Sequence, residues 1–282
     1  MTHRIARYIV EYAPHRRKTG FTLVEMSIVL VIIGLIIGGT IVGQSLLRQS
    51  LLNSVVTDEQ RYSQAIQNFQ QKYGALPGDM PNATALWGNW ATSGGACPAT
   101  NATPMTGQAT CNGDGNGEIG ISGAWTAARS EWFLVWQHLV NAQMITGFYN
   151  GAPGSAGSQD SVPGVNVPAS RVKGAGFGIS FLGIQYVATP VVGSTYWFNG
   201  SWGHQIGFGG YQANNCACGS IITATEAASI DAKYDDGLPG TGNITTNTPA
   251  SSACATTYYA STAVYNVTQT GNSCNLLFTT GF

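Results

Sequence analysis

Charged side chains are scarce in this chain: only 9% of its 282 residues are Asp, Glu, Lys or Arg. The sequence also lacks a Gly-rich phosphate loop, a serine nucleophile elbow and paired metal-binding histidines, so nothing in it proposes the enzyme classes that depend on these motifs. No cluster of basic residues follows residue 20. Bulk nucleic-acid binding therefore has no electrostatic basis, because it depends on clustered positive charge.

Small uncharged residues take the place of the missing charges. The chain holds 37 glycines and is rich in Ser, Thr, Asn and Ala, a composition that suits an exported protein built from loops and short strands. Residues 1–20 carry five basic residues and one acid, whereas the remainder carries seven basic and twelve acidic residues. Because positive charge stays on the cytoplasmic side of a membrane, the segment after residue 20 is predicted to point outward.

Residues 21–43 form one hydrophobic segment, which as a helix is roughly 35 Å long and can cross a bilayer. Glycines at Gly34, Gly38, Gly39 and Gly43 allow close helix packing but also weaken the helix, so packing and local unwinding both stay open. No proline occurs between residues 21 and 76. The sequence therefore predicts one helix of about 50 residues, stopped by Gly74 and Pro77-Gly78.

The second half of this helix is amphipathic. Its predicted apolar stripe, with steps of mostly three or four residues, consists of Leu47, Leu51, Val55, Tyr62, Ile66, Phe69 and Tyr73. The polar residues predicted on the other faces are Arg48, Asp58, Glu59, Arg61, Gln64, Gln67, Gln71 and Lys72. We expect the first half to serve as membrane or filament core and the second as a spine against a globular part.

The junction before the apolar segment reads Arg16-Arg17-Lys18-Thr19-Gly20-Phe21-Thr22-Leu23-Val24-Glu25. An ordinary secretory signal is cleaved after its apolar core, whereas the candidate cleavage point here lies before it. The junction resembles the class III leader of type IV prepilins and type II secretion pseudopilins. The resemblance implies that a prepilin peptidase cuts after Gly20 and methylates the new amino terminus at Phe21. A plain membrane anchor is the alternative interpretation.

Glu25 is the lone acid of the apolar segment, and an acid inside a membrane span is by default a functional hypothesis. A buried carboxylate needs a partner, or it takes up a proton or moves to a polar surface. The resemblance implies pairing with the amino terminus of a neighbouring Phe21, which sets the stagger of subunits during assembly. The alternative places Glu25 at the level of the lipid headgroups.

We predict an α+β protein with a leader at 1–20, a helix at 21–74 and an extracytoplasmic head at 75–282. Within the head, residues 130–145 predict an aromatic helix ended by Gly147. Segments 177–187, 195–198 and 204–208 are rich in β-type residues and predict an antiparallel sheet. Residues 223–234 predict a short helix with a capping box of Thr223 and Glu226, closed by Gly237. The tail after residue 257 adds one or two strands.

Six cysteines all lie in the predicted extracytoplasmic part, namely Cys97, Cys111, Cys216, Cys218, Cys254 and Cys274. An even number in an oxidising compartment predicts disulfides. We expect Cys97 to pair with Cys111, and Cys216 and Cys218 each to pair with Cys254 or Cys274, because Cys216 and Cys218 are too close to favour each other. A zinc site is the alternative, although no histidine lies near the cysteines in sequence.

Oxygen-bearing side chains alternate in Asn112, Asp114, Asn116 and Glu118, with a glycine at the sixth place, as at the start of an EF-hand calcium loop. The match fails at the twelfth position, where Gly123 replaces the bidentate acid. A distant acid such as Glu131 or Asp160 would have to complete a calcium site. An Asn/Asp/Gly turn that needs no ion explains the same residues, so no cofactor is required and calcium stays open.

The remaining candidates have simpler interpretations. His138 on the aromatic helix is expected to be structural, and Asp235-Asp236 to belong to a turn that ends a helix. Four tryptophans, Trp87, Trp90, Trp197 and Trp202, are the aromatics that an adhesive head would expose to sugars or surfaces.

The resemblance implies a structural subunit of a type IV pilus-like filament and not an enzyme. Its partners would be the prepilin peptidase, other pilin or pseudopilin subunits and an inner-membrane assembly platform. The precursor would cross the inner membrane once with its head in the periplasm, then enter a pilus or pseudopilus that can reach the cell surface. The large head favours a minor, tip-located or specialised subunit. A pseudopilin of a type II secretion system, a tip adhesin and a membrane-anchored enzyme are the alternatives.

Overall fold

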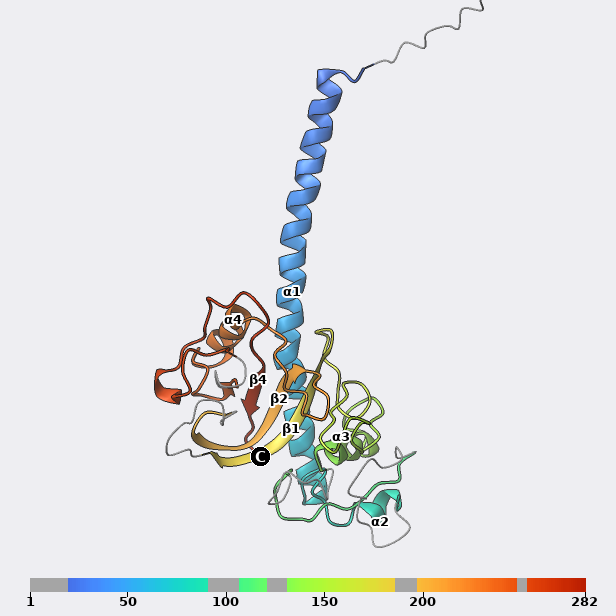
Figure 1. Cartoon of the computed structure of the whole chain (residues 1–282). Helices are drawn as coiled ribbons and strands as arrows, with labels where there is room; N and C mark the ends of the chain where they lie inside the picture. The colour runs from blue at the N-terminus through green and yellow to red at the C-terminus, as the bar shows by residue number, and fades with distance from the viewer. Residues whose placement is uncertain (1–19, 91–106, 121–130, 186–196, 248–252) are drawn as a thin grey trace, which may run out of the picture. The chain divides into compact units, whose positions relative to one another are not determined.

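The computed structural model describes residues 20–90, 107–120, 131–185, 197–247 and 253–282 (Figure 1). The chain divides into two compact units, Met1–Arg48 and Gln49–Phe282. No residue from Gly20 to Arg48 is buried, and the hydrophobic core begins at Leu52. A chain that begins near residue 46 would therefore keep the whole core that the structure describes.

Helix α1 (Leu23–Tyr73) is one helix of 51 residues, as predicted. It ends where Gly74 adopts a positive φ of 70° and donates its N–H to the carbonyl of Gln70, a conformation that glycine adopts without strain. The helix is assigned without a break through Gly34 and Gly43, so no unwinding occurs there in the single chain. By length and composition it can cross a membrane.

The part of α1 that lies in the second unit buries one face in the core. Val55, Tyr62, Ile66 and Phe69 of the predicted stripe are buried, whereas Leu47, in the first unit, is 68% exposed. The stripe is wider than predicted, because Leu52, Val56 and Ala65 are also buried. The prediction for Glu59 was wrong: it lies on the buried side and is only 9% exposed, since it follows Val55 and Val56 at helical spacing.

Four antiparallel strands form one sheet in the order β1-β2-β4-β3. Their bounds are Ala175–Gln185 for β1, Gly200–Gly210 for β2, Ile244–Thr245 for β3 and Leu276–Thr279 for β4. Buried Phe177 and Ile179 of β1 face Phe208 and Ile206 of β2 across the register, with glycines between them. This alternation places one face of both strands in the core.

The sheet differs from prediction at its edges. β1 begins two residues before the predicted segment, and β2 extends beyond 204–208 in both directions because glycines, which disfavour strands, pair here with glycines. Phe198 of the predicted strand at 195–198 is buried but lies outside any strand, and residues 195 and 196 lie outside the described residues. The tail supplies β4, while residues 260–262 form a short 3₁₀ turn.

The described part of the second unit also contains three short helices: α2 (Ala83–Trp87), α3 (Glu131–Asn141) and α4 (Ala224–Tyr234) (Figure 1). The predicted capping box of α4 is present, with Thr223 Oγ1 accepting from the Glu226 N–H and the Glu226 carboxylate accepting from the Thr223 N–H. Helix α3 ends earlier than predicted, because the chain turns at Gln143 with a positive φ of 59°. Its buried face includes Phe133, Trp136 and Leu139.

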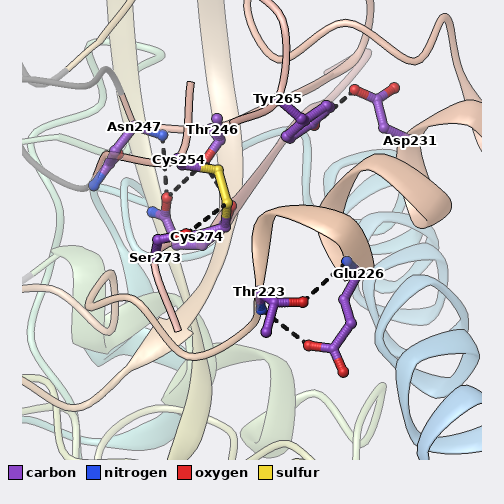
Figure 2. The surroundings of a disulfide bond; sticks show 10 residues. Thr223, Glu226, Asp231, Thr246, Asn247, Cys254, Tyr265, Ser273 and Cys274 are labelled. Carbon is purple, nitrogen blue, oxygen red and sulfur yellow. Dashed lines mark hydrogen bonds between the residues drawn. A yellow bond between two sulfur atoms is a disulfide. The ribbon is translucent and has the colours of Figure 1, made fainter. Parts of the chain in front are cut away.

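Two disulfides overturn the predicted pairing of the later cysteines. Cys216 bonds to Cys218 and Cys254 bonds to Cys274, with Cα atoms 5.1 Å and 4.9 Å apart, both within the range a disulfide spans. Figure 2 shows the Cys254–Cys274 bond. Cys274 also lies in an antiparallel bridge with Ile222, and a second bridge joins Ala255 to Tyr265 in the chain between the two cysteines. Cys111 is disulfide-bonded, and its predicted partner Cys97 lies outside the described residues.

Candidate functional site

The junction at the amino end of α1 is exposed. Gly20 and Phe21 precede the helix in irregular backbone, Phe21 is 81% exposed, and no described atom lies within 4 Å of the position a Cβ would take on Gly20. Nothing in the described chain therefore covers the peptide bond between Gly20 and Phe21. Residues 1–19 of the predicted leader lie outside the described residues.

Glu25 takes part in a capping box at the start of α1. The Thr22 N–H and hydroxyl both donate to Glu25 Oε2, at 2.8 and 2.9 Å, and the Glu25 N–H donates to Thr22 Oγ1 at 3.2 Å. In the single chain the carboxylate is thus held by its own helix terminus, which also favours negative charge. The spacing Thr22-x-x-Glu25 is the signal that sequence reasoning overlooked here.

Apart from Glu25, the first half of α1 exposes mainly apolar side chains. Leu23, Leu30, Leu35 and Ile41 are 64–87% exposed within a run from Phe21 to Leu47 in which Glu25 is the only charged residue. Monomeric soluble proteins rarely leave an apolar surface of this extent uncovered. A lipid bilayer or neighbouring helices would cover it.

Three acids from separate segments meet near the predicted calcium loop. Carboxylate oxygens of Asp79, Asp114 and Glu131 lie within 4.8 Å of one another. Asp114 and Glu131 were among the predicted residues, but Asp79 was not. Asp79 follows α1 in the chain and lies 35 residues before Asp114. Only the fold brings the two side chains together. No local pattern in the sequence signals this meeting.

Backbone N–H groups of the loop satisfy these acids. Asp79 accepts hydrogen bonds from the N–H groups of Gly115, Asn116 and Gly117, while Glu131 accepts from Asp114 and Gly120. Burial raises the pKa of Asp79 and raises that of Glu131 to about 7. The acids thus hold the loop in place by hydrogen bonding, and Glu131 is partly protonated at neutral pH.

The other predicted ligands do not join this cluster. The side-chain oxygen of Asn112 accepts from the Thr84 N–H, and that of Asn116 accepts from the Glu118 N–H. Glu118 itself is exposed. Asp160 belongs to a different loop, where it accepts from the N–H groups of Ala156 and Asn214.

Calcium is expected to leave the stability of the head unchanged. Five N–H groups already bind Asp79 and Glu131, so the loop has its polar partners without an ion. The test compares the melting temperature of a soluble chain that begins at residue 46 in excess calcium and in excess chelator. A rise with calcium that is lost in Asp79→Asn would contradict this expectation and would assign a calcium site.

The two histidines of the head bind backbone and are placed inside the fold. His138 is fully buried, accepts the Gly78 N–H at Nδ1 at 2.9 Å and lies 2.9 Å from Thr110 Oγ1 at Nε2. Its burial lowers its pKa to about 3, so it stays neutral. His204 accepts the Ile119 N–H at Nε2. Both side chains tie loops to α3 and β2.

A second acidic group closes helix α4. Asp231 accepts hydrogen bonds from the Gly237 N–H and from the Tyr265 hydroxyl, at 3.0 and 2.7 Å (Figure 2). Asp235 accepts from the Ile244 N–H and Asp236 from the Leu238 N–H. These bonds form the helix-ending turn that the sequence predicts.

The four tryptophans named for an adhesive head are each partly buried. Trp87 packs against Phe69, Tyr73 and His138, and Trp202 donates its indole N–H to the Phe198 carbonyl. Trp90 packs against the pair of Cys111 and Leu134, and Trp197 is also partly buried. Part of each of the four side chains is therefore packed inside the head.

Comparison with known proteins matches only the amino-terminal segment. The family described as the prokaryotic N-terminal methylation motif matches residues 15–41. Searches of curated proteins and of solved structures gave no significant match. The matched residues include the Gly20–Phe21 junction, the Thr22–Glu25 capping box and the first turns of the exposed apolar helix. The chain therefore carries the class III leader of type IV pilin-like proteins.

Proposed function

We propose that this protein is a structural subunit of a type IV pilus-like filament. It is made as a precursor, cleaved after Gly20, N-methylated at Phe21 and assembled through its amino-terminal helix. One observation carries the proposal: the methylation motif leads directly into an exposed apolar helix surface on which Glu25 is the only charge.

The same helix accounts for both the membrane and the filament stage. Before assembly the bilayer covers residues 21–47, because their length and apolar character match the hydrocarbon core. In the filament the helices of neighbouring subunits cover one another, and glycines such as Gly34 and Gly38 permit close approach because no side chain stands there. Burial of this apolar surface between neighbouring helices favours assembly.

The partners follow from this route. A prepilin peptidase processes the precursor in the inner membrane, an assembly platform extracts it, and other subunits receive it. The head lies in the periplasm until the filament grows. The fold supports a pilus and a type II secretion pseudopilus equally. Neighbouring genes distinguish the two, since a pilus operon and a secretion operon encode different partners.

Gly20→Val is expected to leave the precursor uncleaved. The peptidase acts at a residue without a side chain, and a β-branched residue there would obstruct the approach of the backbone. Immunoblots of cells that carry the peptidase would show only the longer form. Thr19→Val, a change of similar shape one residue earlier, serves as the control and is expected to be cleaved. Cleavage of both variants, or of the unmodified chain in cells without the peptidase, would contradict the proposed processing.

A further inference from the structure

Glu59 lines a pocket in the second unit. The pocket has a volume of about 150 Å³ and lies where α1, the end of α4 and strands β3 and β4 meet. Tyr234, Asn243 and Thr279 contribute its polar lining, and Val56 and Phe278 its apolar lining. Glu59 is 9% exposed, so its carboxylate is largely out of bulk water yet borders an opening to the surface.

The Glu59 carboxylate has no partner among the described residues. The other buried acids, Asp79, Glu131, Asp160 and Asp231, each accept at least two hydrogen bonds, whereas no hydrogen bond or ion pair is found for Glu59. A buried carboxylate without a partner is costly. Glu59 is thus the exception in a head that otherwise satisfies its buried acids.

No basic side chain lines the pocket from any of its elements. Tyr234 on α4 is the other titratable residue in the pocket lining. Asp235 accepts hydrogen bonds from the N–H groups of Asn243 and Ile244, which also line the pocket. On α1 itself, Asp58 and Arg61 pair with each other at 3.5 Å. Lys233 on α4 donates to Asn53 Oδ1 at 3.1 Å. Burial alone raises the pKa of Glu59 to about 7, because no nearby positive charge offsets it.

A second part of the head carries basic side chains that lack an acidic partner. Arg171 and Lys173 lie exposed on the turn before β1, and neither has a hydrogen bond or ion pair among the described residues. Other bases are engaged: Arg61 with Asp58 and Tyr62, Lys72 over the Tyr73 ring, and Lys233 with Asn53. Among the bases of the head that the structure describes, Arg171 and Lys173 are therefore the two left without a partner.

The turn and the pocket lie apart in the described chain. β1 begins at Ala175, which pairs with Gly210, whereas Phe278 at the pocket pairs with Ile206. Four residues along β2 separate these positions by roughly 14 Å, and β2 itself lies between β1 and β4 in the sheet. A base from another chain, such as a second copy of this one, would supply the partner that Glu59 lacks among the described residues.

We propose that the Glu59 pocket receives Lys173 of a second copy of this chain, with Arg171 beside it, as a contact between heads in the assembled filament. The inference rests on the proposed function, since it requires copies held side by side. An ion pair formed there satisfies the buried carboxylate only on assembly. The contact thus selects the assembled state over the free subunit.

Zero-length cross-linking tests the contact in unmodified filaments of the full chain. A carbodiimide condenses a carboxylate with an amine that touches it, forming an amide with loss of water. Mass spectrometry is expected to find a peptide joining Glu59 to Lys173 of another copy. Filaments in which Glu59 joins no Lys173, or joins a different protein, would overturn the proposal. A wild-type chain that forms no filaments would overturn the proposed function and this inference with it.

A double-mutant cycle measures the same contact without a reagent. Glu59→Gln and Lys173→Gln are each expected to lower the yield of sheared filaments at least roughly tenfold, and the double variant no further, because both remove one interaction. Asp58→Asn, which removes the neighbouring charge, is the control and keeps a near-normal yield. The melting temperature of the full-length Glu59→Gln chain should not fall. Independent losses that multiply, or a normal yield for Glu59→Gln, would contradict the contact.

Discussion

Glu25→Ala is expected to leave the precursor inserted and cleaved but to abolish filaments. The site of cleavage lies five residues earlier, in exposed irregular backbone, whereas the Glu25 carboxylate accepts its hydrogen bonds from Thr22. In the filament, by contrast, the apolar surface of residues 21–47 is covered, and an unpaired carboxylate buried there must find a cation. In the proposed filament, the amino terminus of Phe21 in a neighbouring subunit would supply one. Immunoblots report cleavage, and electron microscopy of sheared material reports filaments.

Glu25→Gln separates the two roles of this side chain. In the single chain Glu25 accepts hydrogen bonds from Thr22, and a glutamine retains an oxygen that accepts them but has no charge. If pairing with an amine drives assembly, Glu25→Gln lacks filaments as Glu25→Ala does. If the cap alone matters, Glu25→Gln assembles normally, and the proposed pairing fails. Thr22→Val, which removes the hydroxyl of the cap and keeps the charge, completes the comparison and is expected to assemble.

Replacement of both Cys254 and Cys274 by alanine is expected to lower the free energy of unfolding of the head by about 3 kcal/mol. The bond closes a loop with a sequence separation of 20 residues, and opening it gives the unfolded chain more freedom. Both cysteines are fully buried, and the neighbouring Thr246 hydroxyl donates to the carbonyl of Asn275 (Figure 2). The loss would lower the melting temperature by roughly 6–12 °C.

Cys216 and Cys218 provide the matched control for this measurement. Their bond has a sequence separation of only two, so removing it should cost less than about 2 kcal/mol. Thermal and urea unfolding of a soluble chain that begins at residue 46 would give both values, since the core begins at Leu52. An equal or larger loss for the Cys216–Cys218 pair would contradict the expectation that the longer loop closed by Cys254–Cys274 contributes more stability.

Local patterns predicted the elements that are determined locally. The absence of proline and the positions of Gly74 and Gly78 gave the full length of α1, and Thr223 with Glu226 gave the start of α4. The amino-terminal motif gave the leader, since it is contiguous in sequence. Thr22 and Glu25 have the same capping-box spacing as Thr223 and Glu226. The cap at the start of α1 was therefore also predictable from the sequence.

Features set by tertiary contact could not be predicted in the same way. The cysteine pairing depends on loops that the sheet positions: Cys274 is placed by its bridge with Ile222, not by its distance in sequence from Cys216. Asp79 reaches Asp114 only because α1 ends beside the loop. The sequence places Glu59 on the polar face of the helix. In the fold, residues of β4 and α4 lie against that side of the helix.

The amino terminus of the chain isolated from sheared filaments tests the central claim most directly. The account predicts, by mass spectrometry of that material, a chain that begins at Phe21 and carries one methyl group on its α-amino nitrogen. The same chain from cells without the prepilin peptidase should begin before Gly20 and occur only in the membrane. Filaments built from uncleaved chain, or a processed chain that never leaves the membrane fraction of assembling cells, would contradict the account.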